Sequence, residues 1–271
     1  MDTRFWGPSG WAFLHQITFA YSHHQKKVVQ ELFETLPYVL PCKFCRASLS
    51  GYLRKDPLEP ALESQRSLSR WLWTIHNRVS AKLREQGETM GPDPTFESVE
   101  SFYKDSLKSG CTETYFPGWD FLFSIAENHP LSRDAKNSTP ISGAPVRNPG
   151  MSDTELNEWN LLEPEELFVY YKRFWAAIGD SLPYREWREL WAKAVRKTGF
   201  LKELGNRASL RKALWKIRCM IEEEFELLNR TKFAHLCQIL VENRSGCTRS
   251  SRSKTCRAMS PRSRTQTRRH R

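Results

Sequence analysis

The stretch Pro41-Cys42-Lys43-Phe44-Cys45 decides the fold that the sequence predicts. Two cysteines separated by two residues are typical of a redox-active dithiol or of half a zinc site. Before them, residues 28–40 repeat apolar side chains at the spacing of one buried helical face. Pro41 ends that helix, because a residue preceding a proline disfavours helical backbone. Cys45 then begins a helix expected over residues 45–55, where the unpaired N–H groups of a helix start favour the thiolate needed for exchange chemistry.

Two segments rich in tryptophan and histidine flank the cysteine pair. In a helix expected over residues 9–26, Trp11 and His15 are four residues apart and therefore share a face. A helix expected over residues 65–86 has one ordinary apolar face. Its other face carries Trp73, Asn77, Ser80 and Arg84, with His76 adjoining. Core packing explains either segment alone, whereas the two together around a C-x-x-C predict a thiol redox centre beside a bound aromatic cofactor.

The remaining sequence predicts helices and shows no strand alternation. A short helix is expected over residues 95–109, and residues 129–153 have the Pro, Ser, Gly and Asn content of a linker. A second helical block follows at about 163–179, 184–198, 207–229 and 231–242. A chain of 271 residues is long for one domain and natural for two. The expected organisation is a first domain at 1–128, a linker at 129–153, a helical domain at 154–242 and a basic, cysteine-containing tail at 243–271.

The positive charge of the chain is concentrated at its C-terminal end. Ten of the 42 Lys and Arg residues, and none of the 31 Asp and Glu residues, lie in residues 243–271. The first 242 residues therefore hold 32 basic and 31 acidic side chains and are close to neutral. A tail of this composition is expected to be disordered. Weak, non-specific polyanion binding is one role that its charge allows.

Cysteine usage and apolar patterning indicate a compartment. No apolar run approaches the length of a transmembrane helix, and Met1-Asp2-Thr3-Arg4 does not begin a signal peptide. We therefore expect no membrane contact and a cytoplasmic location. The seven cysteines are Cys42, Cys45, Cys111, Cys219, Cys237, Cys247 and Cys256. Such scattered usage fits a redox relay better than a small secreted scaffold held by disulfides.

Over about residues 5–110, these segments resemble the Erv/ALR family of FAD-linked sulfhydryl oxidases. The family pattern is W-x-x-L-H, then C-x-x-C, then H-N-x-V-N-x-K-L. The matching residues are Trp11, Leu14, His15, Cys42, Cys45, His76, Asn77, Val79, Lys82 and Leu83. Gly7 also matches, and Ser80 stands where the family usually has asparagine. Three motifs in the family's order and spacing predict membership of this family.

The resemblance implies an all-α fold, a four-helix bundle with a short fifth helix that binds FAD at one end. It places Cys42 and Cys45 at the catalytic centre, with the flavin ring against Cys45, and it implies no metal. The cofactor-binding residues that it implies are Gly7, Trp11, His15, Trp73, His76, Asn77, Val79, Ser80, Lys82 and Tyr103. The implied reaction makes disulfides in protein dithiols and reduces O₂ to hydrogen peroxide.

The resemblance also implies a second, mobile cysteine pair that shuttles electrons, and a homodimer. Cys247 and Cys256 in the tail are the shuttle candidates, and Cys219 with Cys237 is the alternative. Cys111 either joins subunits or is a free thiol. A first domain followed by a helical domain and a basic tail looks like the sulfhydryl oxidases of giant DNA viruses such as mimivirus. For a viral protein, the expected location becomes the host cytoplasm or the virion.

Two other classes of function remain open at this point. In the first, Cys42 and Cys45 bind a structural zinc ion together with His23 and His24, in a non-catalytic interaction protein. In the second, the tail makes the chain a nucleic-acid-binding module, although the sequence has no base-reading motif. Colour discriminates between the first alternative and the oxidase, because a flavoprotein is yellow and a zinc protein is colourless.

Overall fold

The computed structural model describes residues 1–88, 91–108, 116–132, 138–226 and 232–244, and over these residues it is all-α, without a strand. The N-terminal helices are α1 (Thr3–Ala20), α2 (Lys26–Val39), α3 (Lys43–Lys55), α4 (Gln65–Glu85) and α5 (Phe96–Lys108), with 3₁₀ turns η1 (His23–Gln25) and η2 (Glu59–Glu63). The later helices are α6 (Trp119–Glu127), α8 (Asp153–Glu158), α9 (Pro164–Ser181), α10 (Arg185–Thr198), α11 (Arg207–Glu224) and α12 (Phe233–Glu242), with η3 (Pro130–Ser132) and η4 (Phe200–Gly205). The predicted all-α class is confirmed.

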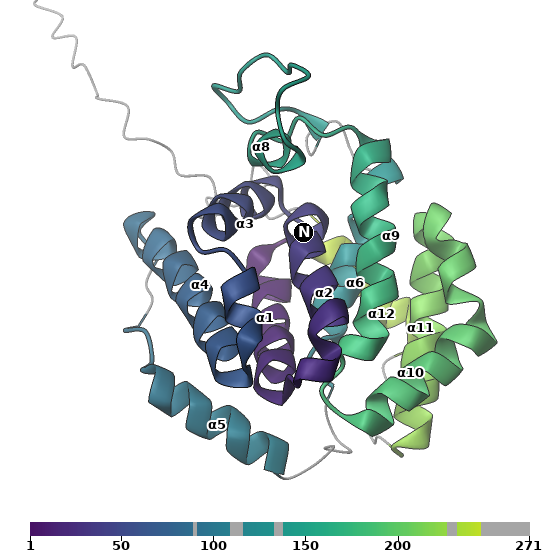
Figure 1. Ribbon diagram of the computed structural model, residues 1–271. Coiled ribbons are helices and arrows are strands. Elements are labelled where there is room, and N and C mark those ends of the chain that lie inside the picture. Colours follow the sequence, from purple (N-terminus) through teal and green to yellow (C-terminus); the bar gives the residue numbers. More distant parts are fainter. Residues whose placement is uncertain (89–90, 109–115, 133–137, 227–231, 245–271) are drawn as a thin grey trace, which may run out of the picture.

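The first four helices form the bundle that holds the cysteine pair (Figure 1). α1 packs against α4, α2 packs against α3, and α5 contacts α1 and α4 at one side of the bundle. α6 lies against α1 at a close approach, where a Cβ added to Gly10 would lie 2.9 Å from the ring of Phe121. The amphipathic faces predicted for these helices are buried together in one core.

α1 begins at Thr3, six residues before the helix start expected from the sequence. The side chain of Asp2 accepts a hydrogen bond from the N–H of Arg4 at 2.9 Å and so caps the helix, with Pro8 inside it. The N–H of Asp2 also donates to the carbonyl oxygen of Asn243 at 2.8 Å. Capping and this long-range bond explain why the N-terminal residues are helical.

α3 begins at Lys43, so that Cys42 is its N-cap and Cys45 lies in its first turn. The carbonyl oxygen of Cys42 accepts from the N–H groups of Cys45 and Arg46, both at 3.0 Å. The helix was expected to begin at Cys45, and it begins two residues earlier, so that Cys42 precedes it and Cys45 lies within its first turn. Both side chains are partly buried.

The second helical block packs directly on the first. α9 runs alongside α2 (Figure 1), where Arg173 forms an ion pair with Glu31 at 2.6 Å and Gln25 donates to the carbonyl oxygen of Asp180 at 2.9 Å. One hydrophobic core cluster includes side chains from both blocks. The division into domains at 1–128 and 154–242 stays a prediction, and in the described residues the two segments share a core.

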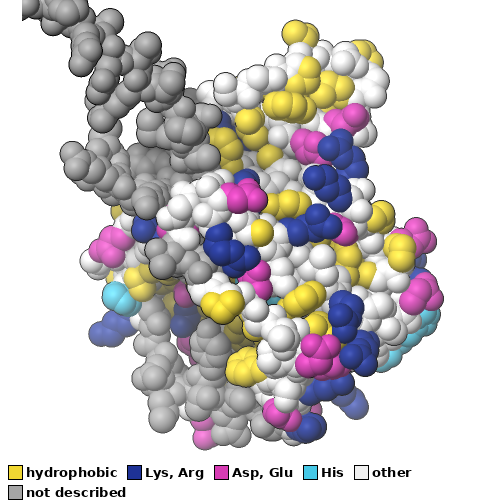
Figure 2. Space-filling model, turned by 90° about the vertical axis from the view of Figure 1, so that its left-hand side faces the viewer, with side chains coloured by type: hydrophobic (Ala, Val, Ile, Leu, Met, Phe, Trp, Pro, Cys, Tyr) yellow, Lys and Arg dark blue, Asp and Glu magenta, His cyan; other side chains and the backbone are white. Residues whose placement is uncertain are grey.

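The face of the molecule in Figure 2 carries basic and acidic side chains interspersed with one another. This mixture agrees with the near-neutral balance of the first 242 residues. No described helix combines the length and the apolar character that crossing a membrane requires.

Candidate redox and cofactor site

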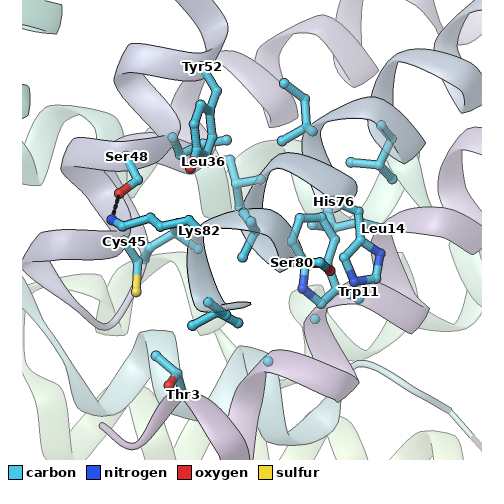
Figure 3. A pocket seen from close by; sticks show the side chains of 18 of the residues that line it. Thr3, Trp11, Leu14, Leu36, Cys45, Ser48, Tyr52, His76, Ser80 and Lys82 are labelled. Atoms are coloured by element: carbon cyan, nitrogen blue, oxygen red, sulfur yellow. Dashed lines mark hydrogen bonds between the residues drawn. The ribbon is translucent and has the colours of Figure 1, made fainter. Parts of the chain in front are cut away.

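A cavity of about 630 Å³ lies within the bundle, and Cys45 contributes to its wall (Figure 3). Its lining comes mainly from α1, α3 and α4, with single residues such as Tyr103 of α5 and Phe121 of α6. The lining is mostly apolar, with a few polar groups. Volume and lining are those of a site for a small organic molecule or cofactor.

One end of the cavity is formed by stacked rings from two helices. Trp11 of α1 lies flat on His76 of α4, with ring centroids 3.9 Å apart and planes 8° apart. His15 lies behind this pair, and its Nε2 is 3.1 Å from Nδ1 of His76. Burial lowers the pKa of His76 to about 4 and, together with the charge of His76, the pKa of His15 to about 3. Both imidazoles are therefore neutral at pH 7, so one of the two ring nitrogens donates this hydrogen bond and the other accepts it.

The opposite end of the cavity carries the sulfur and a cation. In Figure 3 the side chain of Cys45 points into the cavity beside Lys82 of α4, whose amino group donates to the hydroxyl of Ser48 on α3. Tyr52, one turn further along α3, lines the same wall. Cys45, Ser48 and Tyr52 are three or four residues apart, so the helical period places them on one face. This end offers a thiol, an ammonium group and a hydroxyl within one enclosure.

Most of the residues that the sequence analysis assigned to cofactor binding line this cavity. They are Gly7, Trp11, His76, Val79, Ser80, Lys82 and Tyr103. His15 is buried behind His76 and is not part of the wall. Trp73 and Asn77 do not line it either. Ser48 and Tyr52 line the cavity too and were not predicted, although their helical spacing from Cys45 places them on its face.

The second face expected on α4 is divided between two environments. The indole N–H of Trp73 donates to the carbonyl oxygen of Pro94 at 3.0 Å, and its ring meets Phe96 edge-on. Arg84 forms an ion pair with Asp93. Both therefore contact the segment that leads into α5, although Trp73 is only three residues from His76. The cavity side of α4 is carried by His76, with Val79, Ser80 and Lys82.

The four residues of the alternative zinc site do not come together. No group of three or more His, Cys, Asp or Glu side chains in the described part of the chain could hold a metal ion. His23 and His24 lie in the exposed turn η1, where the hydroxyl of Ser22 contacts the ring nitrogens of His24 at 3.1 and 3.2 Å. Sequence proximity alone had suggested them as ligands, and the structure corrects this.

The other cysteines are distributed over the chain. Cys219 lies in α11 and Cys237 in α12, and both are partly buried. Cys111, Cys247 and Cys256 lie outside the described residues. The assignment of a shuttle pair and of a subunit-joining cysteine therefore stays a prediction.

Comparison with known proteins finds relatives of the N-terminal part of the chain. Residues 8–98 match the model of the Erv1/Alr family. The mitochondrial FAD-linked sulfhydryl oxidase ERV1 of Saccharomyces cerevisiae is 30% identical over 111 residues, which are 40% of this chain and 52% of the yeast protein. A protein of Acanthamoeba polyphaga mimivirus, provisionally named as a FAD-linked sulfhydryl oxidase, is 34% identical over 85 residues, 30% of this chain and 59% of its own.

A protein of Invertebrate iridescent virus 3, provisionally named in the same way, is 27% identical over 89 residues, 31% of this chain and 60% of its own. The chain thus spans between about half and three fifths of the length of these relatives. No solved structure matches it. The match includes both cysteines, and three of its residues, Trp11, Cys45 and His76, line the cavity. Residues 8–98 of this chain are thus similar to the Erv1/Alr family.

Proposed function

We propose that the protein is a FAD-linked sulfhydryl oxidase that makes disulfides in protein dithiols. The observation that carries this proposal is that Cys45 lines the same cavity as the Trp11–His76 stack and Lys82. A cysteine of a C-x-x-C pair thus lies beside a space with an aromatic end and a cationic end. The relatives given above are named as FAD-linked, which supports the same cofactor here.

The residues of the cavity fit FAD. Trp11 and His76 offer flat ring surfaces to an aromatic group, and Lys82 with Ser48 offers a cation and a hydroxyl to phosphate oxygens. The buried indole N–H of Trp6, in the cavity wall, has no hydrogen-bond partner among the described residues and can donate to a ligand. When bound, FAD supplies the acceptor chemistry that takes two electrons from a dithiol and passes them to O₂, which leaves as hydrogen peroxide.

Cys42 and Cys45 have different tasks because only Cys45 lines the cavity. A substrate thiolate attacks Cys42, which is partly exposed at the N-cap of α3, and the bond between Cys42 and Cys45 breaks. The second substrate thiol loses its proton, attacks the substrate sulfur of this mixed disulfide and releases Cys42. The substrate leaves as a disulfide, and the two electrons stay on Cys42 and Cys45 inside the protein.

The proposal is tested by the absorption spectrum of the purified full chain and by oxygen uptake with dithiothreitol. We expect the visible bands of an oxidised flavin and one hydrogen peroxide formed for each O₂ consumed. A protein that stays colourless at saturating FAD, or a yellow protein without dithiol-dependent oxygen uptake, would contradict the proposal.

A further inference from the structure

Arg46, directly after the second cysteine, is entirely buried. It lies in the first turn of α3, and its backbone N–H donates to the carbonyl oxygen of Cys42 at 3.0 Å. Arginine is rarely buried to this extent unless it is paired. The partners of its guanidinium group therefore indicate what this side chain does.

The guanidinium group of Arg46 is held by neutral acceptors. Nη1 donates to the carbonyl oxygen of Leu40 at 3.1 Å, and Nη2 donates to the side-chain oxygen of Asn160 at 2.5 Å. Nε is buried without a partner, and no carboxylate of the described residues lies within ion-pair distance of Arg46. A buried charge without a counter-ion is costly, because dipoles replace only part of its hydration.

The two cysteines are the groups that can supply the missing negative charge. Burial lowers the pKa of Arg46 to about 10, and negative charge on Cys42 and Cys45 acts against this shift. Arg46 is thus still a cation at neutral pH. Because a Coulomb interaction is mutual, thiolates that favour the charged arginine are favoured by it to the same extent.

Asn160 comes from the turn after α8, outside the residues that match the family. Its backbone has a φ of 56°, in the left-handed region that asparagine tolerates better than most residues. Its amide group also donates to the carbonyl oxygen of Thr139 at 2.9 Å. Asn157 ties α8 to the bundle by donating to the carbonyl oxygen of Pro37 at 3.0 Å and to Ser50 at 2.9 Å.

We propose that Arg46, positioned by Asn160, is the buried counter-charge for the thiolate that forms when the Cys42–Cys45 disulfide is reduced. The segment after the family match thereby tunes the redox centre. The proposal rests on the proposed function only in that Cys42 and Cys45 exchange with dithiols. In the balanced step, a substrate dithiol becomes a disulfide, the Cys42–Cys45 bond breaks, and one proton goes to solvent while one thiolate stays opposite Arg46.

Other charges around the cysteine pair are engaged or lie nearer the surface. The amino group of Lys43 donates to Thr139 at 2.8 Å, that of Lys82 donates to Ser48, and that of Met1 is 3.5 Å from the carbonyl oxygen of Pro41. The acidic groups next to α3 and α1 have basic partners. These ion pairs are Glu158 with Arg54 and Asp2 with Arg4. Arg46 differs from all of these cations in being completely enclosed.

The test compares Arg46→Gln with Arg46→Lys in the full chain, reduced and kept under anaerobic conditions. The pH dependence of alkylation of the Cys42–Cys45 peptide, followed by mass spectrometry, gives the thiolate midpoint. We expect Arg46→Gln to raise this midpoint by about one pH unit, the lower end of the effect of a nearby opposite charge. In a glutathione buffer, the equilibrium constant between the dithiol and the Cys42–Cys45 disulfide should shift about tenfold toward the disulfide. For two electrons this corresponds to a change of about 30 mV in reduction potential. Arg46→Lys keeps the charge and should recover most of both shifts.

Asn160→Asp provides an independent variant, because a carboxylate at Nη2 would give Arg46 a competing counter-ion. It should move the midpoint in the same direction as Arg46→Gln, and further than Asn160→Gly, which removes the amide without adding charge. Asn206→Asp makes the same chemical change at the N-cap of α11, where aspartate caps equally well, and should leave the midpoint unchanged.

Equal midpoints for wild type and a folded Arg46→Gln protein would overturn the proposal, as would equal midpoints for Arg46→Gln and Arg46→Lys. If Arg46→Gln does not fold, an unshifted, folded Asn160→Asp protein overturns it. These measurements need neither flavin nor oxygen. A colourless protein that shows the expected shifts would therefore disprove the oxidase function and leave the role of Arg46 standing.

Discussion

The indole ring of Trp11 lies flat on the imidazole of His76, with ring centroids 3.9 Å apart and planes 8° apart. The two residues come from α1 and α4, so the contact exists only when the bundle is folded. His15 fixes the imidazole through a ring-nitrogen hydrogen bond of 3.1 Å. Two motifs far apart in the sequence thus form one end of the cavity, and this end can be tested separately from the cysteines.

Replacement of His76 by alanine should weaken FAD binding. The substitution removes the ring that stacks on Trp11 and leaves His15 without its partner. We expect a loss of about 1–3 kcal/mol, the range for buried polar groups left unpaired. Titration of apoprotein with FAD, followed by flavin fluorescence, measures it. The control is His24→Ala in the exposed turn η1, which should bind FAD as wild type does. Equal FAD affinity of the two variants would show that His76 is not part of the cofactor site.

Acid should destabilise the folded protein between about pH 6.5 and pH 3. Burial lowers the pKa of His76 to about 4 and that of His15 to about 3. In this window the unfolded chain binds more protons than the folded protein, so the free energy of unfolding falls as the pH falls. Each histidine contributes up to about 1.4 kcal/mol per pH unit. Urea unfolding at several pH values checks this, and His15→Gln should flatten the pH dependence. A His15→Gln protein with the wild-type slope would show that His15 is not the group that titrates.

Cys42→Ala and Cys45→Ala should each abolish dithiol oxidation and leave FAD bound. Exchange needs both sulfurs, whereas the cavity wall is made mainly by side chains of α1, α3 and α4. Oxygen uptake with dithiothreitol and the flavin spectrum measure the two effects. Cys219→Ala, a partly buried cysteine of α11, is the control and should oxidise this small dithiol at the wild-type rate. Dithiothreitol-dependent oxygen uptake by either single variant would show that Cys42 and Cys45 do not form the redox centre.

Glu127→Ala should destabilise the fold strongly. The carboxylate of Glu127 is almost completely buried at the end of α6, where it accepts from Arg211 at 2.8 Å and from Nε of Arg244 at 3.0 Å. Removing one member of a buried ion pair leaves uncompensated charge and costs about 3–5 kcal/mol. Urea unfolding measures the loss. Glu63→Ala, which breaks an exposed pair with Lys26, should cost less than about 1 kcal/mol. Similar losses for both variants would show that the Glu127 cluster does not stabilise the contact between α6 and α11.

Helices with one apolar stripe could be predicted from the sequence. Residues 28–40 correspond to α2 (Lys26–Val39), and residues 184–198 correspond to α10 (Arg185–Thr198). α6 was missed because every residue from Phe121 to Glu127 is buried, so its sequence has no polar face to reveal a helical period. Short α8 was missed too, although its Ser152–Glu155 capping box is a recognisable signal.

The residues of the candidate site could be predicted where they belong to a sequence motif. Cys45, Trp11, His76 and Lys82 come from three motifs and meet at one cavity. Arg46 could not be assigned a role from the sequence, because its environment is set by Asn160, more than a hundred residues away. Trp73 was expected at the cofactor site but does not line the cavity. Its indole N–H donates instead to the carbonyl oxygen of Pro94, a tertiary contact that the sequence of α4 does not reveal.

Cys247 and Cys256 are expected to carry electrons from protein substrates to Cys42. Both lie outside the described residues, but the last described part of the chain ends close to the redox centre. The carbonyl oxygen of Asn243 accepts from the N–H of Asp2 at 2.8 Å, and the amino group of Met1 is 3.5 Å from the carbonyl oxygen of Pro41, next to Cys42. Cys247 is the fourth residue after Asn243, a separation that a fully extended chain spans over about 13 Å.

The double variant Cys247→Ser/Cys256→Ser removes both thiols and keeps every charge of the tail. If the pair delivers electrons intramolecularly, a folded protein dithiol should be oxidised about tenfold more slowly or worse, because a tethered thiol acts at high effective concentration. Dithiothreitol reaches Cys42 directly and should be oxidised at the wild-type rate. The control is Cys219→Ser/Cys237→Ser, which tests the alternative pair in α11 and α12. If the tail only attracts acidic partners, the result should be different. The double variant should then oxidise the protein dithiol at the wild-type rate, and salt should slow the wild type and the variant alike. That outcome would leave direct attack on Cys42, or the pair in α11 and α12, as the route for protein substrates.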